Sequence, residues 1–105
     1  MNRILNRQAF FADGTPFYRL YTSDGTGYGV RLRFRTAKDN AELVTVVTDS
    51  MKADMHKCFT EGRFDYYEVM LHYPECGTNY YFTVTGAETD EGKRTAVYGR
   101  CAGLL

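Results

Sequence analysis

The chain has 105 residues, a length that fits one domain and leaves little room for a second. Its 13 basic and 13 acidic residues cancel, which removes the net positive charge that nucleic-acid binding and docking on anionic membranes rely on. Hydrophobic residues make up 44% and charged residues 25%, as in ordinary soluble globular proteins. Aromatic residues make up 15%, all Tyr or Phe, and both types favour strands.

Targeting and redox signals are sparse. The opening ten residues hold no apolar run long enough for a signal peptide, and no stretch of the chain has the length of a membrane span. The cysteines are odd in number and far apart: Cys58, Cys76 and Cys101. We interpret them as reduced thiols of a cytoplasmic protein, and one disulfide is the alternative.

The predicted elements begin with a strand over Gln8–Ala12, which ends at the turn sequence Asp13–Pro16. Tyr21–Gly29 follows as a loop, because it contains three glycines. The clearest strand is Val30–Arg35, in which apolar and basic residues alternate with a period of two.

This alternation predicts a strand with one core face and one basic face. The apolar set is Val30, Leu32 and Phe34, and the basic set is Arg31, Arg33 and Arg35. Such a basic row is typical of a solvated face, or of one that pairs with acidic side chains on a neighbouring strand. Contact with an acidic partner is the alternative.

The middle of the chain predicts a turn over Thr36–Ala41 and a well-buried strand over Glu42–Thr48. Asp49–Asp54 is ambiguous and leaves room for a helical turn. Next, Met55–Thr60 and Arg63–Tyr73 pair as a hairpin around Glu61 and Gly62. The residues of the second arm alternate between two faces. We assign the core face to Tyr67, Val69, Leu71 and Tyr73, and the outer face to Tyr66, Glu68, Met70 and His72.

The last third of the chain predicts a turn over Pro74–Asn79 and a strand over Tyr80–Thr85. A turn over Thr89–Gly92 leads into a final strand over Lys93–Tyr98. Short strands with turn signals at this spacing predict an all-β sandwich of about seven to eight antiparallel strands.

Two segments resemble a known family. Residues 30–40, VRLRFRTAKDN, are similar to a strand and turn near the start of maltogenic amylases, cyclomaltodextrinases and neopullulanases. Residues 64–69, FDYYEV, followed by YYF at 80–82, resemble a second stretch of the same enzymes, and Val44–Asp49 matches a strand between them. Ala9–Phe17 is similar to their opening segment, with Phe11 and Ala12 in place of the usual His region.

The resemblance implies that residues 1–105 are one immunoglobulin-like accessory domain, also classed as carbohydrate-binding module family 34. The parent would be an α-glycosidase of glycoside hydrolase family 13 whose catalytic barrel lies outside this sequence. No catalytic residue is therefore carried over, and no cofactor is expected. The implied partners are an α-glucan or maltooligosaccharide, the parent barrel, and a second copy in a homodimer of the parent enzyme. A structural or protein-interaction domain without sugar affinity is the alternative.

The residues themselves offer no catalytic or metal constellation. Asp65 and Glu68 lie on opposite faces of one predicted strand, so they cannot form the carboxylate pair of a glycosidase. His56 and Cys58 share a strand face, but two further zinc ligands at close spacing are missing. We therefore expect no metal site.

Aromatic side chains are the candidate contact residues. A flat ring stacks on the C–H face of a pyranose, and Tyr adds a hydroxyl group. Exposed rings also serve protein interfaces. The rings that lie outside the assigned core faces are the predicted carbohydrate or interface contacts: Phe17, Tyr18, Tyr21, Tyr66 and Tyr81.

Overall fold

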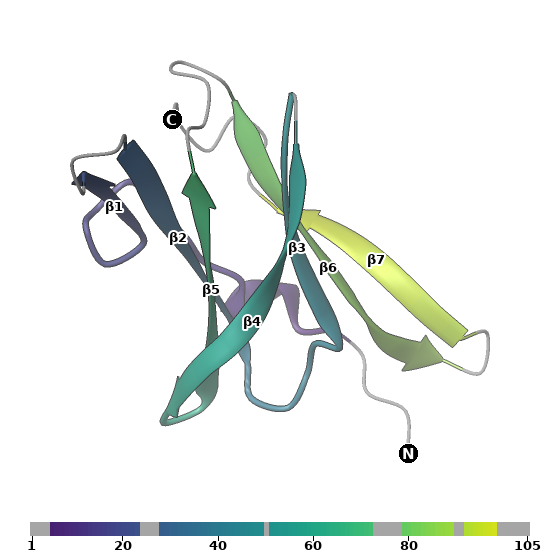
Figure 1. The fold of residues 1–105 in the computed structure, drawn as a ribbon. Helices are drawn as coiled ribbons and strands as arrows, with labels where there is room; N and C mark the ends of the chain where they lie inside the picture. The colour runs from purple at the N-terminus through teal and green to yellow at the C-terminus, as the bar shows by residue number, and fades with distance from the viewer. Residues whose placement is uncertain (1–4, 24–27, 50, 73–78, 90–91, 99–105) are drawn as a thin grey trace.

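The computed structural model describes residues 5–23, 28–49, 51–72, 79–89 and 92–98. These residues form one 3-10 helix and seven strands (Figure 1). The elements are η1 (Arg7–Ala9), β1 (Arg19–Ser23), β2 (Tyr28–Ala37), β3 (Leu43–Thr48), β4 (Lys52–Glu61), β5 (Phe64–His72), β6 (Tyr80–Thr89) and β7 (Gly92–Tyr98).

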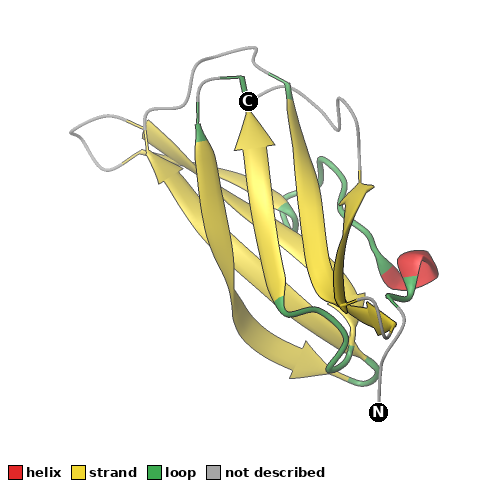
Figure 2. Cartoon of the chain, turned by 90° about the vertical axis from the view of Figure 1, so that its right-hand side faces the viewer, coloured by secondary structure: helices red, strands yellow, loops and turns green. Residues whose placement is uncertain are grey.

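The seven strands are hydrogen-bonded in the order β1-β2-β5-β4-β3-β6-β7, and every pair is antiparallel. Strand β4 belongs to two halves of this sheet: its residues 52–55 pair with β3, and its residues from His56 onward pair with β5. The sheet therefore folds over along β4, and its halves face each other as the layers of a sandwich (Figures 1 and 2). The predicted all-β sandwich is confirmed.

The core lies between the two halves. Phe34 of β2 meets Phe82 of β6 with ring centroids 4.7 Å apart, and both side chains are almost fully buried. The apolar set predicted for Val30–Arg35 is buried completely, so the assignment of its faces is confirmed. Phe10, ahead of the first strand, adds a ring that lies 5.6 Å from Phe34.

The predicted strand Gln8–Ala12 is wrong. Arg7–Ala9 is a 3-10 helix, and the Asn6 side chain caps it by accepting a hydrogen bond from the Gln8 backbone N–H. A capping side chain gives the backbone a local alternative to strand pairing. Pairing in this segment is limited to one bridge between Phe11 and Arg35.

The predicted loop Tyr21–Gly29 is also largely wrong. Tyr21–Ser23 belong to β1, and Tyr28 and Gly29 open β2, while residues 24–27 lie outside the described residues. Gly29 is buried, and an added Cβ would lie 3.0 Å from the Leu71 carbonyl oxygen. Its lack of a side chain thus permits close strand packing, which is a role that glycine also has inside strands.

The remaining elements agree closely with expectation. Strands over Val30–Arg35, Glu42–Thr48, Tyr80–Thr85 and Lys93–Tyr98 are confirmed with longer or slightly shifted ends. The hairpin of β4 and β5 is confirmed, and β4 already starts at Lys52, so the described part of Asp49–Asp54 contains no helical turn. Residues 73–78, which include Tyr73, Cys76 and most of the predicted turn Pro74–Asn79, lie outside the described residues, as does Cys101. Cys58 is a free thiol.

No helix among the described residues is long and apolar enough to cross a bilayer.

Candidate functional site: an aromatic cluster on the outer face

Three rings meet on the outer face of the half-sheet made by β2, β5 and the second part of β4. Phe59 of β4 and Tyr66 of β5 stack, with centroids 4.6 Å apart and ring planes 13° from parallel. Phe17, from the loop before β1, stands edge-on to both, at 5.5 Å from Tyr66 and 6.3 Å from Phe59. We call Phe17, Phe59 and Tyr66 the aromatic cluster.

The cluster presents two rings to solvent above a buried one. The exposed fractions are 42% for Phe17 and 37% for Phe59, against 8% for Tyr66. Burial of Tyr66 beneath the other rings fixes their positions, whereas the outer surfaces of Phe17 and Phe59 remain accessible to a ligand.

A β-bulge places Phe59 in this cluster. Lys57 pairs with Tyr67 and Phe59 pairs with Tyr66, so Cys58 is an extra residue without its own partner in the register. In a regular strand Phe59 would lie on the same face as Lys57, which is the inner side. The bulge shifts that alternation by one residue and aims Phe59 outward, a known use of bulges beside functional sites.

An ion pair lies beside the rings. The Arg33 guanidinium donates to Glu68 Oε1 at 3.0 Å from Nη2, and its central carbon lies 4.6 Å from the centre of Phe17 and 5.4 Å from that of Phe59. Burial opposes the ionised form of Glu68, but the hydrogen bond and charge of Arg33 outweigh it and lower the pKa of Glu68 below its ordinary value. The site therefore combines exposed rings with a charged donor and acceptor pair.

The basic row was predicted to be solvated or to pair with acidic side chains on a neighbouring strand. Pairing is confirmed for Arg33, which binds Glu68 of β5. Arg35 instead donates from Nε to the Ala9 carbonyl oxygen at 3.0 Å and lies over the rings of Phe11 and Phe64. Each side chain of the row is partly buried. The row is thus engaged within the molecule.

The structure brings three of the five predicted contact residues together: Phe17, Tyr18 and Tyr66. Tyr18 lies 4.9 Å from Phe17, but it is 9% exposed, and burial raises its pKa. The expectation that Tyr18 and Tyr66 are exposed is wrong, because the loop before β1 folds Phe17 over them. They support the cluster from below.

The other two predicted residues lie elsewhere. Tyr21 is 49% exposed on the edge strand β1, where the Arg19 guanidinium lies 6.0 Å from its ring. Tyr81 of β6 pairs with Val47 on the opposite half of the sandwich and is half-buried. Neither residue contributes to the aromatic cluster.

Phe59 is the member that sequence reasoning missed. Its outward direction depends on the bulge at Cys58, and no residue around Cys58 signals a bulge in the sequence. The flanking apolar residues Leu20 and Met70 were not predicted as contacts either. They are 39% and 38% exposed and extend the outer face beyond the cluster, one on each side of Arg31.

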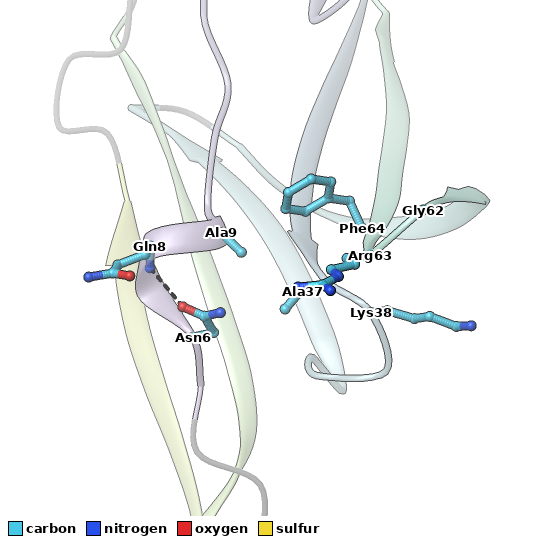
Figure 3. A pocket seen from close by; sticks show the side chains of 8 residues that line it. All are labelled: Asn6, Gln8, Ala9, Ala37, Lys38, Gly62, Arg63 and Phe64. Atoms are coloured by element: carbon cyan, nitrogen blue, oxygen red, sulfur yellow. Dashed lines mark hydrogen bonds between the residues drawn. The ribbon is translucent and has the colours of Figure 1, made fainter.

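A separate pocket of about 650 Å³ lies between η1 and the β4–β5 hairpin (Figure 3). Ala9 and the ring of Phe64 border it, whereas the polar ends of Gln8 and Lys38 extend away from Phe64 in this view. Binding sites for small molecules usually have several polar groups that converge on one point. This pocket lacks that convergence among the side chains drawn, so the aromatic cluster is the better candidate site.

The described residues contain no group of three or more His, Cys, Asp or Glu side chains placed to hold a metal ion.

The comparison with known families decides the identity of the domain. The family described as "Alpha amylase, N-terminal ig-like domain" matches residues 19–100, which is most of the chain. The chain belongs to this family. The resemblance to the immunoglobulin-like domain of such enzymes is thereby confirmed.

This alpha amylase N-terminal Ig-like domain is non-catalytic, and the 105 residues do not include a catalytic domain. The matched range runs from the first residue of β1 to beyond β7. Arg33, Phe59, Tyr66 and Glu68 therefore lie within it, whereas Phe17 comes just before it. No curated protein matches the chain in the sequence search.

Proposed function

We propose that the chain serves an α-glucan-degrading enzyme of glycoside hydrolase family 13 as an accessory domain that binds α-glucan or maltooligosaccharide weakly through the aromatic cluster. Membership in the alpha amylase N-terminal Ig-like family supports the kind of parent enzyme. The observation that carries the binding proposal is the pair of exposed rings, Phe17 and Phe59, beside the Arg33–Glu68 ion pair. Rings stack on the apolar face of a pyranose, and the ion pair offers partners to its hydroxyl groups.

Weak binding fits the size of this surface. Two exposed rings and one ion pair cover at most a few sugar units, and Phe17 and Phe59 face solvent. Ligand sites with high affinity usually bury most of the ligand surface. We therefore expect affinities in the millimolar range, on the order of 4 kcal/mol of binding free energy.

A second function is favoured by the apolar residues around the cluster. Leu20 and Met70 are exposed on the same face, and an outer face that mixes Phe, Leu and Met is typical of a protein interface. In this alternative the face packs against the catalytic barrel of the parent enzyme, helps to shape its active-site cleft or dimer, and has no sugar affinity.

Affinity electrophoresis of the 105-residue chain in gels with soluble starch or pullulan, with calorimetry against β-cyclodextrin, separates the two functions. We expect retardation of the wild-type chain, and its loss in Phe17→Ala and Phe59→Ala. Leu43→Ala is the matched control, because Leu43 is 42% exposed on β3 in the other half of the sandwich. Absence of retardation and of heat at millimolar sugar would favour the barrel interface.

A further inference from the structure

Arg31 contacts the loop that carries Phe17. Its Nη2 atom donates two hydrogen bonds, to the Pro16 carbonyl oxygen at 2.9 Å and to the Phe17 carbonyl oxygen at 3.0 Å. Both acceptors lie in the segment just before β1, at the position where its backbone presents the Phe17 ring to the outer face. Arg31 thus holds the backbone of the residue that completes the aromatic cluster.

The loop is attached to β2 at both ends, and Arg31 fixes the part between them. The bridge between Phe11 and Arg35 holds one end, and a hydrogen bond from the Arg33 N–H to the Tyr18 carbonyl oxygen holds the other. Between these points a turn closes by a bond from the Tyr18 N–H to the Thr15 carbonyl oxygen. Pro16 and Phe17 lie inside that turn, where their own carbonyl groups meet the Arg31 side chain.

The hydrogen bonds of the Arg31 guanidinium go to this loop. Leu20 and Met70 flank it across the strands and are apolar, whereas Glu68, whose pKa the charge of Arg31 also lowers, hydrogen-bonds to Arg33. The Nε atom of Arg31 is buried and has no hydrogen-bond partner among the described residues, which is a cost the site accepts. An unsatisfied buried group calls for an explanation, and the two hydrogen bonds from Nη2 of the same guanidinium to the loop supply one.

We propose that Arg31 is a positioning residue: it orients Phe17 over Phe59 and Tyr66 without itself belonging to the surface that meets the ligand. This inference rests on the proposed function, because it concerns the same aromatic cluster. Removal of the guanidinium releases the Phe17 backbone while all three rings remain in the chain. The buried Tyr66 then loses its cover, and the exposed surface loses the edge-on ring.

The experiment compares Arg31→Gln and Arg31→Lys with the wild-type 105-residue chain. Nuclear Overhauser effects between Phe17 and Tyr66 ring protons report the position of Phe17, and effects between Phe34 and Phe82 report an intact core. We expect Arg31→Gln to lose the first set and keep the second. Lysine keeps the charge but lacks the planar donor fork, so Arg31→Lys should restore only part of the Phe17 contacts.

Gel retardation in soluble starch gives the functional readout. Arg31→Gln should lose as much retardation as Phe17→Ala, and the double variant should lose no more than either single one, because both changes remove the same ring from the site. Arg63→Gln, an exposed arginine in the β4–β5 turn, should retain full retardation. Retained Phe17–Tyr66 effects in Arg31→Gln would overturn the positioning role.

Failure of the proposed function is distinguishable from failure of this inference. If the wild-type chain shows no retardation, glucan binding is refuted, and the ring-proton contacts still decide whether Arg31 positions Phe17. If the wild-type chain is retarded and Arg31→Gln is retarded equally, glucan binding stands and the role of Arg31 does not.

Discussion

Asp65 is a buried carboxylate near the β4–β5 turn, with an exposed fraction of 1%. It accepts hydrogen bonds from the Thr60 hydroxyl, the Asp39 backbone N–H and the Lys57 ammonium. Asp39 has a left-handed φ of 56°, so one carboxylate stabilises both an unfavourable turn residue and the adjacent hairpin. Burial alone would raise the pKa of Asp65, but these donors together lower it below its ordinary value.

Because the folded state lowers this pKa, ionised Asp65 favours folding at every pH above the ordinary value of 3.8. That contribution disappears as the pH falls from 3.8 through the lower folded-state pKa. At pH 7 we expect Asp65→Asn to reduce the free energy of unfolding by roughly 1.5–3 kcal/mol, the usual range for hydrogen bonds to a charged group. Urea denaturation followed by circular dichroism measures the change.

Urea denaturation repeated at lower pH, down to pH 3, distinguishes the loss of the ionised carboxylate from a general packing defect in Asp65→Asn. The wild-type chain should lose more stability on acidification than Asp65→Asn, so the two curves should converge. Asp54→Asn is the control, since Asp54 is exposed and its remaining carbonyl oxygen can still accept from Thr45. Parallel curves for wild type and Asp65→Asn would contradict this explanation.

At the scale of elements, the β4–β5 hairpin depends on a two-residue turn of Gly62 and Arg63. Glu61 pairs with Phe64, and Gly62 has a φ of +63°, whereas Arg63 does not have a positive φ. A turn of this kind, with a positive φ at its first central residue, favours glycine there. An added Cβ at Gly62 would meet no atom within 4 Å, so only backbone conformation argues against a side chain.

Gly62→Ala should therefore destabilise the domain through backbone strain alone, by about 1–2 kcal/mol. Arg63→Ala in the same turn should change the stability by less than about 0.5 kcal/mol, as for ordinary surface sites. Thermal unfolding of both variants provides the comparison. Equal melting temperatures for Gly62→Ala and wild type would show that the turn relaxes to another conformation.

The elements also show how far the local sequence pattern can determine the fold. Strict alternation predicted β2, and glycine with a neighbouring acidic residue predicted the turn after β4. The segment Gln8–Ala12 was also predicted as a strand, but Arg7–Ala9 is a 3-10 helix capped by Asn6, and Phe10, the residue after it, reaches the core. The glycine-rich stretch concealed β1, because its pairing with β2 comes from tertiary contacts that override local preference.

At the scale of the whole molecule, stability depends on contact between the two halves of the sandwich. Phe82 of β6 is 1% exposed and packs on Phe34 of β2. Phe82→Ala should reduce the free energy of unfolding by about 3–5 kcal/mol, the usual cost of removing a buried ring. Phe59→Ala removes a ring that is 37% exposed and should cost clearly less. Chemical denaturation that gives similar losses for both variants would contradict this division.

The candidate site was only partly predictable, because it is made by segments that are distant in the sequence. Phe17 and Tyr66 are predictable as contacts because they lie outside the core faces that strand alternation assigns, and the structure places their rings side by side. Phe59 joins them through a bulge, and Tyr81 is separated from them because β6 lies in the other half of the sandwich. Sequence pattern gives the direction of a side chain within one regular strand. It does not give the three-dimensional arrangement that brings separate segments together.

Strand β4 hydrogen-bonds to β3 with its first residues and to β5 with the remainder. Two layers held together by side chains alone can separate while each layer keeps its main-chain bonds. Here the layers share a strand, so an opening that frees the amide hydrogens of one layer also disturbs those of the other. We expect the amides of β3 and β5 to exchange with heavy water in one cooperative event, and the domain to behave as a single unit under thermal fluctuation.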